Sequence, residues 1–335
     1  LAVRGNDKSP SDAFSVLDGV HSLKNEKVLQ KQEEWNLMTV YYTPSPDARK
    51  AIQEKTRANA SLCWACSACD SECPVFMGSS RLRPQKVLRM ANLGLLDELV
   101  DLPEIWYCLA CKRCTRSCPN DCEPETVVGF LRKEAIRTDL YSKEALSHYE
   151  EFYTRFQRVR WRAAEQCLKG DEMASISPSQ WQAWLETPIE IQAEDVCLSD
   201  LSPSEGFITE ADRSQTASCF NCSECTNACP ICFERNVFDP QWIFRMVNLG
   251  LEKEILKSPS IWLCIACQIC TSTCSQLVSG HDMIRRLQEL AVKEGMVDPG
   301  FPLRWKKTQG LLYPLFTRQI DSIFGFEDIA LASNQ

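Results

Sequence analysis

The 335-residue sequence lacks several features that would each define a class of protein. No run of 18 apolar residues occurs, so no transmembrane helix is expected, and the opening LAVRGNDKSPSD has no apolar segment of a secretory signal. Neither G-x-G-x-x-G nor G-x-x-x-x-G-K-[ST] is present, so no flavin, nicotinamide or nucleotide site is signalled. The net charge of -8 argues against binding nucleic acid, which requires cations for the phosphates, and serves solubility instead.

The first residue is Leu rather than Met, so we expect the chain to be processed or incompletely covered at its start. Without an export signal, the expected compartment is the reducing cytoplasm, where structural disulfides are rare. Histidine is scarce, with 3 residues, whereas cysteine is abundant, with 20. Sixteen of these cysteines form four runs of the pattern C-x2-C-x2-C-x3-C. The runs are Cys63, Cys66, Cys69, Cys73; Cys108, Cys111, Cys114, Cys118; Cys219, Cys222, Cys225, Cys229; and Cys264, Cys267, Cys270, Cys274.

The third and fourth runs repeat the first and second at a constant offset of 156 positions, as Cys63 and Cys219 show. Between Cys63 and Cys118 the offset needs no gap, and 24 of the 56 positions are identical. The clearest stretch is RMANLGLLDELVDLPEIWYCLAC at 89–111 against RMVNLGLEKEILKSPSIWLCIAC at 245–267. Such self-similarity predicts one structural unit used twice.

The segments between and after the runs have helical periodicity. Pro84 is suited to a first helical turn and Gly94 to a C-terminal cap, and Pro240 and Gly250 repeat them. Apolar residues at helical spacing follow the second run of each unit, and residues 142–168 also read as helix. LMTVYYT at 37–43 suits a short strand or an extended arm, and the polar residues 1–35 suit partial disorder. The expected fold class is all-α.

Three chemistries could use thiols packed this closely: disulfides, zinc, or iron–sulfur clusters. Zinc sites with four cysteines usually pair two short knuckles separated by a longer stretch. Three cysteines at steps of three, followed by a fourth after x3 and then by proline, are typical of bacterial ferredoxins. Proline follows the fourth cysteine in three of the four runs, and Ser275 replaces it in the last. The pattern therefore favours four [4Fe-4S] clusters.

In two-cluster ferredoxins the fourth cysteine of a run ligates the neighbouring cluster. This rule predicts four ligand sets. We call them outer set 1 (Cys63, Cys66, Cys69, Cys118), inner set 1 (Cys108, Cys111, Cys114, Cys73), outer set 2 (Cys219, Cys222, Cys225, Cys274) and inner set 2 (Cys264, Cys267, Cys270, Cys229).

Several residues near the runs are left without a cluster role. The other cysteines, Cys122, Cys167, Cys197 and Cys232, do not recur at the 156 offset and are expected to be ordinary thiols. His281 is expected at the surface of a helix start, and Trp106 and Trp262 in the core.

Lys112, Arg113 and Arg116 lie between cysteines of the second run. These three cations either raise the reduction potential of inner set 1 or form a docking face for an acidic partner.

The paired runs, the helical spacer of about 35 residues and the helix after the second run resemble the C subunit of heterodisulfide reductase, present twice. The resemblance covers 60–140, the first repeat, and 216–295, the second repeat. It implies two tandem α-helical ferredoxin domains with two [4Fe-4S] clusters each. The expected division is an N-terminal extension 1–55, domain 1 at 56–169, a linker 170–215, domain 2 at 216–300 and a C-terminal tail 301–335.

The resemblance implies an electron-transfer subunit without a catalytic substrate site of its own, in a heterodisulfide-reductase-like complex. Flavoprotein and CCG-domain subunits are the implied partners. The chain has no Cys-Cys pair, and so lacks the CCG domain that carries the disulfide chemistry in that family. Two alternatives remain open. One is an iron–sulfur subunit that links a dehydrogenase to a quinone-reactive membrane anchor, peripheral to the membrane. The other is a non-redox protein whose clusters staple small domains.

Overall fold

The computed structural model of the chain describes residues 42–190 and 208–326. Within these residues every regular element is a helix, so the all-α prediction is confirmed. The stretch predicted as a strand or arm, 37–43, lies outside the described residues except for Tyr42 and Thr43, which have no regular structure. The polar stretch 1–35 also lies outside them. The described residues between Ser45 and Phe326 form one compact unit that contains both repeats.

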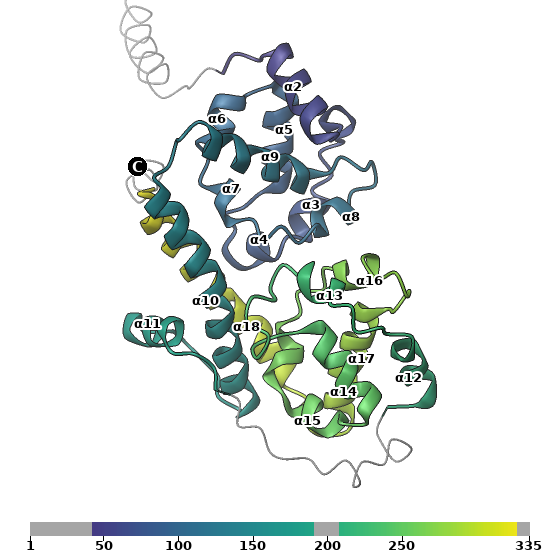
Figure 1. Cartoon of the computed structure of the whole chain (residues 1–335). Helices are drawn as coiled ribbons and strands as arrows, with labels where there is room; N and C mark the ends of the chain where they lie inside the picture. Colours follow the sequence, from purple (N-terminus) through teal and green to yellow (C-terminus); the bar gives the residue numbers. More distant parts are fainter. Residues whose placement is uncertain (1–41, 191–207, 327–335) are drawn as a thin grey trace, which may run out of the picture. The chain divides into compact units, whose positions relative to one another are not determined.

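The first repeat and its flanks are built from short helices followed by one long helix (Figure 1). The elements are α2 (Pro46–Thr56), η1 (Ala60–Leu62), α3 (Ala68–Ser71), α4 (Pro74–Ser79), α5 (Pro84–Leu93), α6 (Leu96–Val100), α7 (Glu104–Tyr107), α8 (Arg113–Arg116), α9 (Pro124–Arg137) and α10 (Lys143–Leu168).

The second repeat has counterparts of most of these elements, although 230–235, which correspond to α4, form no helix, and α11 (Pro178–Glu186) lies between the two repeats in sequence. The elements are α12 (Glu210–Ala217), α13 (Glu224–Asn227), α14 (Pro240–Leu249), α15 (Glu252–Lys257), η4 (Pro259–Leu263), α16 (Ile269–Ser272), α17 (Gly280–Lys293) and α18 (Phe301–Phe324). The bounds of α14, α16 and α17 are those of α5, α8 and α9 moved by 156 positions, so the sequence repeat is also a structural repeat.

Local sequence explains where α5 begins and ends. Pro84 occupies the first turn, and Gly94 adopts φ 71° at the C-terminus, where its N–H bonds the carbonyl of Ala91. A Cβ at Gly94 would lie 1.9 Å from the carbonyl oxygen of Ser45, so this position also requires glycine for a close approach. Asp70, from the first cysteine run, accepts a bond from the N–H of Gln85 at 2.8 Å and fixes the helix start beside that run.

The structural repeat extends beyond the sequence repeat, because α18 is the counterpart of α10. The Tyr149 hydroxyl on α10 donates to the carbonyl of Trp106 at 3.0 Å, and the Trp305 indole N–H on α18 donates to the carbonyl of Trp262 at 3.1 Å. Both donors and both acceptors are 156 positions apart. The segment predicted as a C-terminal tail thus contains a long packed helix, and α11, inside the predicted linker, buries Trp181 and Trp184.

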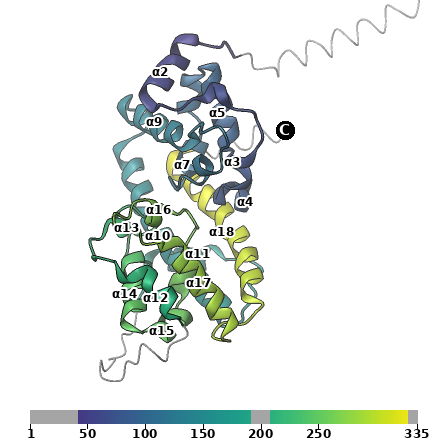
Figure 2. The same cartoon turned by 90° about the vertical axis from the view of Figure 1, so that its right-hand side faces the viewer.

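The two long helices lie beside each other and each reaches the opposite repeat (Figures 1 and 2). Helix α10 packs against η4 of the second repeat, where Arg160 donates to the carbonyl of Leu263 at 2.7 Å. Helix α18 packs against α4 and α7 of the first repeat, where the buried Asp321 accepts bonds from Arg81 and the Tyr107 hydroxyl. This exchange makes each repeat depend on the helix that follows the other.

Candidate functional site

All four cysteine loops adopt the same unusual backbone. In each run, the residue before the second cysteine and the residue after it are left-handed although neither is glycine. These residues are Ala65 and Ser67, Ala110 and Lys112, Asn221 and Ser223, and Ala266 and Gln268. Each left-handed residue costs about 1–2 kcal/mol in an L-amino-acid chain. Such strain persists where the surroundings impose it, and loops of this type gather backbone N–H groups into concavities that bind anions, including iron–sulfur clusters.

Backbone N–H groups of these loops also reach cysteine sulfurs. The N–H of Ala65 lies 3.4 Å from Sγ of Cys63, and the N–H of Ala110 lies 3.4 Å from Sγ of Cys108. Hydrogen bonds to ligand sulfurs stabilise negative charge there and are one determinant of cluster potential. The loops are therefore organised for anionic sulfur.

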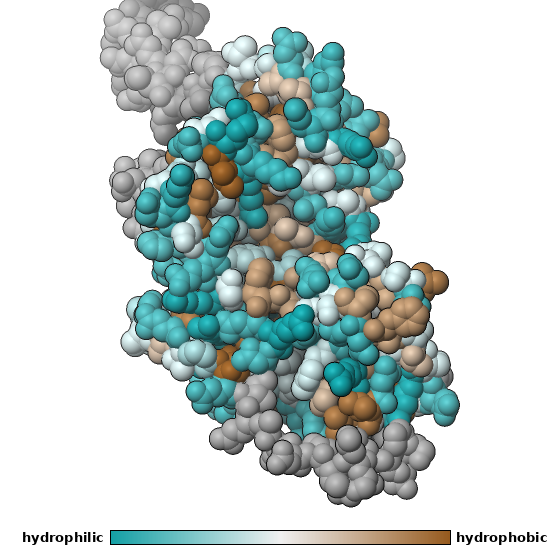
Figure 3. All heavy atoms as spheres, in the orientation of Figure 1, coloured by the Kyte–Doolittle hydropathy of each residue, from teal (hydrophilic) through white to brown (hydrophobic). Residues whose placement is uncertain are grey.

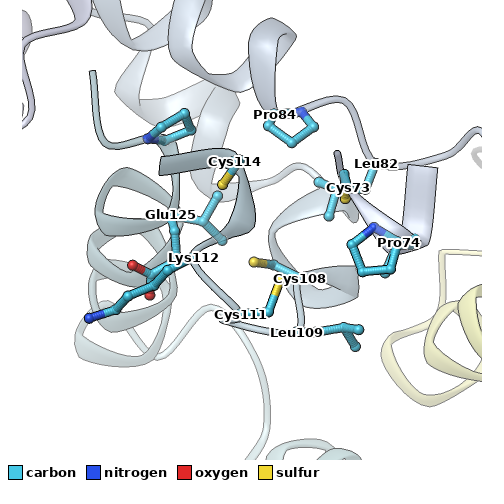
Figure 4. Close-up of a pocket in the computed structure, with 13 residues that line it drawn as sticks. Cys73, Pro74, Leu82, Pro84, Cys108, Leu109, Cys111, Lys112, Cys114 and Glu125 are labelled. Carbon is cyan, nitrogen blue, oxygen red and sulfur yellow. The ribbon is translucent and has the colours of Figure 1, made fainter. Parts of the chain in front are cut away.

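The structure gathers the cysteines of three predicted sets around three separate cavities. Figure 4 shows the first, with Cys73, Cys108, Cys111 and Cys114 around it. A second is lined by Cys229, Cys264, Cys267 and Cys270, and a third by Cys219, Cys222, Cys225 and Cys274 together with Cys270. Each cavity thus combines cysteines of one run with the fourth cysteine of its neighbour. From the sequence, the pairing of three cysteines with the fourth cysteine of the neighbouring run was predicted only from the ferredoxin rule. The fold brings those side chains together around one cavity.

Three cysteines of outer set 1, Cys63, Cys69 and Cys118, lie near Cys122, which is fully buried. The Cys122 N–H donates to Sγ of Cys118 at 3.4 Å. Burial, followed by Cys118, Cys63 and Cys69 nearby, raises the pKa of the Cys122 thiol to about 12. Cys122 therefore contacts the set without belonging to the repeated pattern, which is why spacing could not assign it. Cys66, by contrast, is exposed.

Burial raises the pKa of most of these thiols. It raises that of Cys73 and of Cys111 to about 12, and that of Cys264 to about 11. At neutral pH these side chains are therefore neutral when no metal is bound, and metal binding must displace their protons. Within the described residues, no three His, Cys, Asp or Glu side chains converge on a position for one metal ion. The buried thiols, the cavities and the N–H concavities together fit [4Fe-4S] clusters.

The two repeats meet through their second cysteine loops. Arg116 donates to the hydroxyl of Ser272 at 3.4 Å, and these residues are counterparts, 156 positions apart. Cys111 and Cys267 are also counterparts, and the proximity of Cys267 adds to the burial that raises the pKa of the Cys111 thiol. A surface that contacts its own copy is the mark of two-fold symmetry. The repeats therefore pair like a dimer within one chain, with the inner sets at the centre.

Two side chains bridge the inner loops across this pairing. Arg113 donates to the carbonyl of Ile265 at 2.9 Å and forms an ion pair with Glu72 at 2.6 Å. The Tyr153 hydroxyl, on α10, lies 3.1 Å from the carbonyl of Leu109 and 3.3 Å from that of Pro230. The basic loop, predicted as either a tuning group or a docking face, thus directs Arg113 and Arg116 at the second repeat.

The third cation of that loop, Lys112, is exposed and points away from the cysteine sulfurs of its cavity (Figure 4). The anions of the first run are also paired. Asp70 lies 3.2 Å from Arg83, as Glu72 lies beside Arg113. The net charge near outer set 1 is therefore less negative than its loop sequence indicates.

The remaining predicted residues occupy various environments. Trp106 and Trp262 are buried, as core packing requires, and Trp106 stacks on Phe324 with ring centroids 4.6 Å apart. Cys167 is buried beside Thr308, and Cys197 lies outside the described residues. Burial raises the pKa of Cys232 to about 12. His281 lies at the start of α17, as predicted, but its side chain is 12% exposed rather than at the surface and lines the cavity of inner set 2.

Comparison with protein families places a 4Fe-4S dicluster domain in each repeat. One family model of that description matches residues 30–123 and a second matches 215–278. The chain is therefore an iron–sulfur protein with two dicluster domains, and hence four [4Fe-4S] clusters.

Relatives of known name refine this class. The chain is 32% identical over 116 residues to a protein of Archaeoglobus profundus named as like the C subunit of heterodisulfide reductase, covering 35% of this chain and 58% of that one. It is 33% identical over 81 residues to the C subunit of the H(2):CoB-CoM heterodisulfide,ferredoxin reductase of Methanothermobacter thermautotrophicus, covering 24% and 43%. The chain spans about half the length of the curated relatives it matches. It is homologous to the C subunits of heterodisulfide reductases.

Among the described residues, no helix is both long and apolar enough to cross a bilayer. The face shown in Figure 3 is mostly hydrophilic, with separate small apolar patches.

Proposed function

We propose that this chain is an electron-transfer subunit that relays single electrons between partner subunits of a heterodisulfide-reductase-like complex. The observation that carries the proposal is the order of the cysteine sets in the paired repeats. The inner sets meet at the centre, where Cys111 and Cys267 are buried, and the outer sets reach the surface, where Cys66 and Cys222 are exposed. An arrangement with a shielded middle and two accessible ends suits a carrier.

We further propose that the sixteen cysteines of the four runs are the cluster ligands, in the inner and outer sets defined above. Each bound cluster supplies storage for one electron. The protein holds the sulfurs in fixed loops, donates N–H bonds to them and keeps water from the inner sets. The cavities lined by three of the sets support this assignment.

The proposed partners are a flavoprotein and a subunit with CCG domains, in the cytoplasm. The support is homology to proteins named as subunits of heterodisulfide reductases, together with the absence of a Cys-Cys pair from this sequence. Because the chain lacks that disulfide-handling motif, substrate chemistry belongs to a partner. Electrons then enter at one outer set and leave at the other.

An exposed aromatic side chain marks each of these ends. Trp64, 76% exposed, lies between Cys63 and Cys66, and its counterpart Phe220 is 72% exposed. Aromatic anchors at interfaces typically contribute about 2 kcal/mol to binding, or about thirty-fold in Kd. We therefore expect Trp64→Ala and Phe220→Ala each to weaken binding of a different partner subunit.

The experiment compares these variants with Trp242→Ala, which removes an exposed tryptophan from α14. The proteins are purified anaerobically with co-expressed partner subunits, and co-purification and electron transfer are measured. Iron content should be unchanged in all three, and partner binding should fall in Trp64→Ala and Phe220→Ala alone. Substrate reduction by the pure chain without partners would contradict the carrier function.

A further inference from the structure

The cations at the centre of the paired repeats are distributed unequally. The loop of inner set 1, CLACKRCTRSC, carries three basic residues, whereas the matching loop of inner set 2, CIACQICTSTC, carries none. Two of those basic residues cross the interface. Arg113 reaches the carbonyl of Ile265, between Cys264 and Cys267, and Arg116 reaches the hydroxyl of Ser272, between Cys270 and Cys274.

These contacts place two positive charges beside the cysteines of inner set 2. Ile265, whose carbonyl Arg113 reaches at 2.9 Å, lies two residues before Cys267, and Ser272, which Arg116 reaches at 3.4 Å, lies two residues after Cys270. Ile265 is also the residue that follows Cys264, so Arg113 lies beside two of the four cysteines of inner set 2. Coulomb attraction falls with distance and is weaker in water than in a protein interior, so Arg113, whose side chain is 20% exposed, is screened less than Arg116, which is exposed.

We propose that Arg113 and Arg116 of the first repeat serve as the cations of inner set 2, so that the reduction potential at the second repeat is set across the interface by the first. They are positioning residues, because they contact the loop rather than the cysteine sulfurs. The inference rests on the proposed electron-transfer function.

The other charges around the interface determine which cation dominates. Glu72 pairs with Arg113 and partly offsets its field, whereas the contact of Arg116 is to a neutral hydroxyl. On α10, the buried Arg160 donates to the carbonyl of Leu263, the residue before Cys264, at 2.7 Å. His281 lines the same cavity and faces Asp282 at 3.2 Å. Since both of these belong to every variant tested below, they do not affect the comparison.

The test is an EPR-monitored redox titration of anaerobically purified protein with its clusters bound. Cys267→Ser identifies which signal belongs to inner set 2. Reduction adds one negative charge, which nearby cations stabilise, so Arg113→Gln/Arg116→Gln should move the midpoint potential of that signal to a lower value. Arg113→Lys/Arg116→Lys, which keeps both charges, should restore it toward that of the unaltered protein.

Lys112→Gln is the matched control, since it removes one charge from the same loop but Lys112 points away from the cysteines. Lys112→Gln should leave the midpoint potential of the inner set 2 signal unchanged. The inference is overturned if the double glutamine variant also leaves that potential unchanged, or if Lys112→Gln lowers it equally. Should the double variant lose iron, Arg116→Gln alone, which retains the Arg113 bridge, decides by the same criterion. A lack of iron and sulfide in the unaltered protein would instead refute the proposed function.

Discussion

Asp321, near the end of α18, provides a direct measure of how strongly the first repeat depends on a helix that follows the second. Its carboxylate is 5% exposed and accepts bonds from Arg81 and from the Tyr107 hydroxyl. Tyr107 is itself 1% exposed. Asp321→Asn keeps the shape of the side chain and removes its charge, so it isolates the electrostatic contribution.

The structure sets the expected size of the effect. A hydrogen bond to a charged group contributes about 1.5–3 kcal/mol, against about 0.5–1.5 kcal/mol for a neutral one. The bond to the buried Tyr107 should therefore lose about 1 kcal/mol when the charge is removed. The side chain of Arg81 is 33% exposed, so solvent screening limits its share to about 1 kcal/mol. The free energy of unfolding should fall by about 2 kcal/mol, which lowers Tm by about 4 °C in a protein of this size.

Anaerobic calorimetry at one fixed scan rate measures this change. Asp298→Asn is the control, because Asp298 pairs with Arg304 on the surface with 54% of its side chain exposed. Such a pair contributes less than about 1 kcal/mol. If Asp321→Asn lowered Tm no more than Asp298→Asn, α18 would not stabilise the first repeat through this carboxylate. The conclusion that each repeat depends on the long helix that follows the other would then be wrong.

Three further outcomes are expected. Anaerobically purified protein should contain about sixteen irons and sixteen acid-labile sulfides, four of each per cluster, by metal and sulfide analysis; zinc in their place would be contrary. Cys73→Ser and Cys108→Ser should alter one EPR signal and Cys63→Ser another, and a signal shared by Cys73→Ser and Cys63→Ser would exclude crossed ligation. In protein freed of clusters, iodoacetamide should label the exposed Cys66 and Cys222 first, as mass spectrometry would show; faster labelling of buried cysteines would be inconsistent with this fold.

Much of each repeat could be predicted from its sequence because the signals are local. Proline and glycine placed the helix from Pro84 to Gly94, and the structure has α5 at Pro84–Leu93 with Gly94 as its cap. The amphipathic pattern predicted the helix at 142–168, which is α10 at Lys143–Leu168. The cysteine spacing also predicted that the loops are alike, because the four runs with the same spacing adopt the same backbone conformation.

The pairing of the repeats could not be predicted, because its contacts join residues distant in sequence and of unlike type. Tyr149 and Trp305 make the same hydrogen bond with different side chains. A comparison of residue types at the 156 offset therefore does not show that they are structural counterparts. Pro314 lies inside α18 and breaks the pattern expected of a helix. The sequence predicted that Arg113 and Arg116 tune inner set 1 or dock an acidic partner, whereas the fold supplies Ile265 and Ser272 of the second repeat as their acceptors.

The pairing of two copies within a single chain also has a consequence for direction. A dimer of identical subunits presents the same surface at both ends and cannot distinguish one partner from another. Here the matching positions have different residues: beside the outer sets, Trp64 corresponds to Phe220, and Asp121, left-handed at φ 49°, corresponds to Leu277, left-handed at φ 56° and 87% exposed. The backbone conformation is therefore the same at these matching positions, whereas the side chains differ. One end therefore offers a carboxylate where the other offers an apolar side chain, so the two ends differ in charge and hydrophobicity at positions with the same backbone conformation.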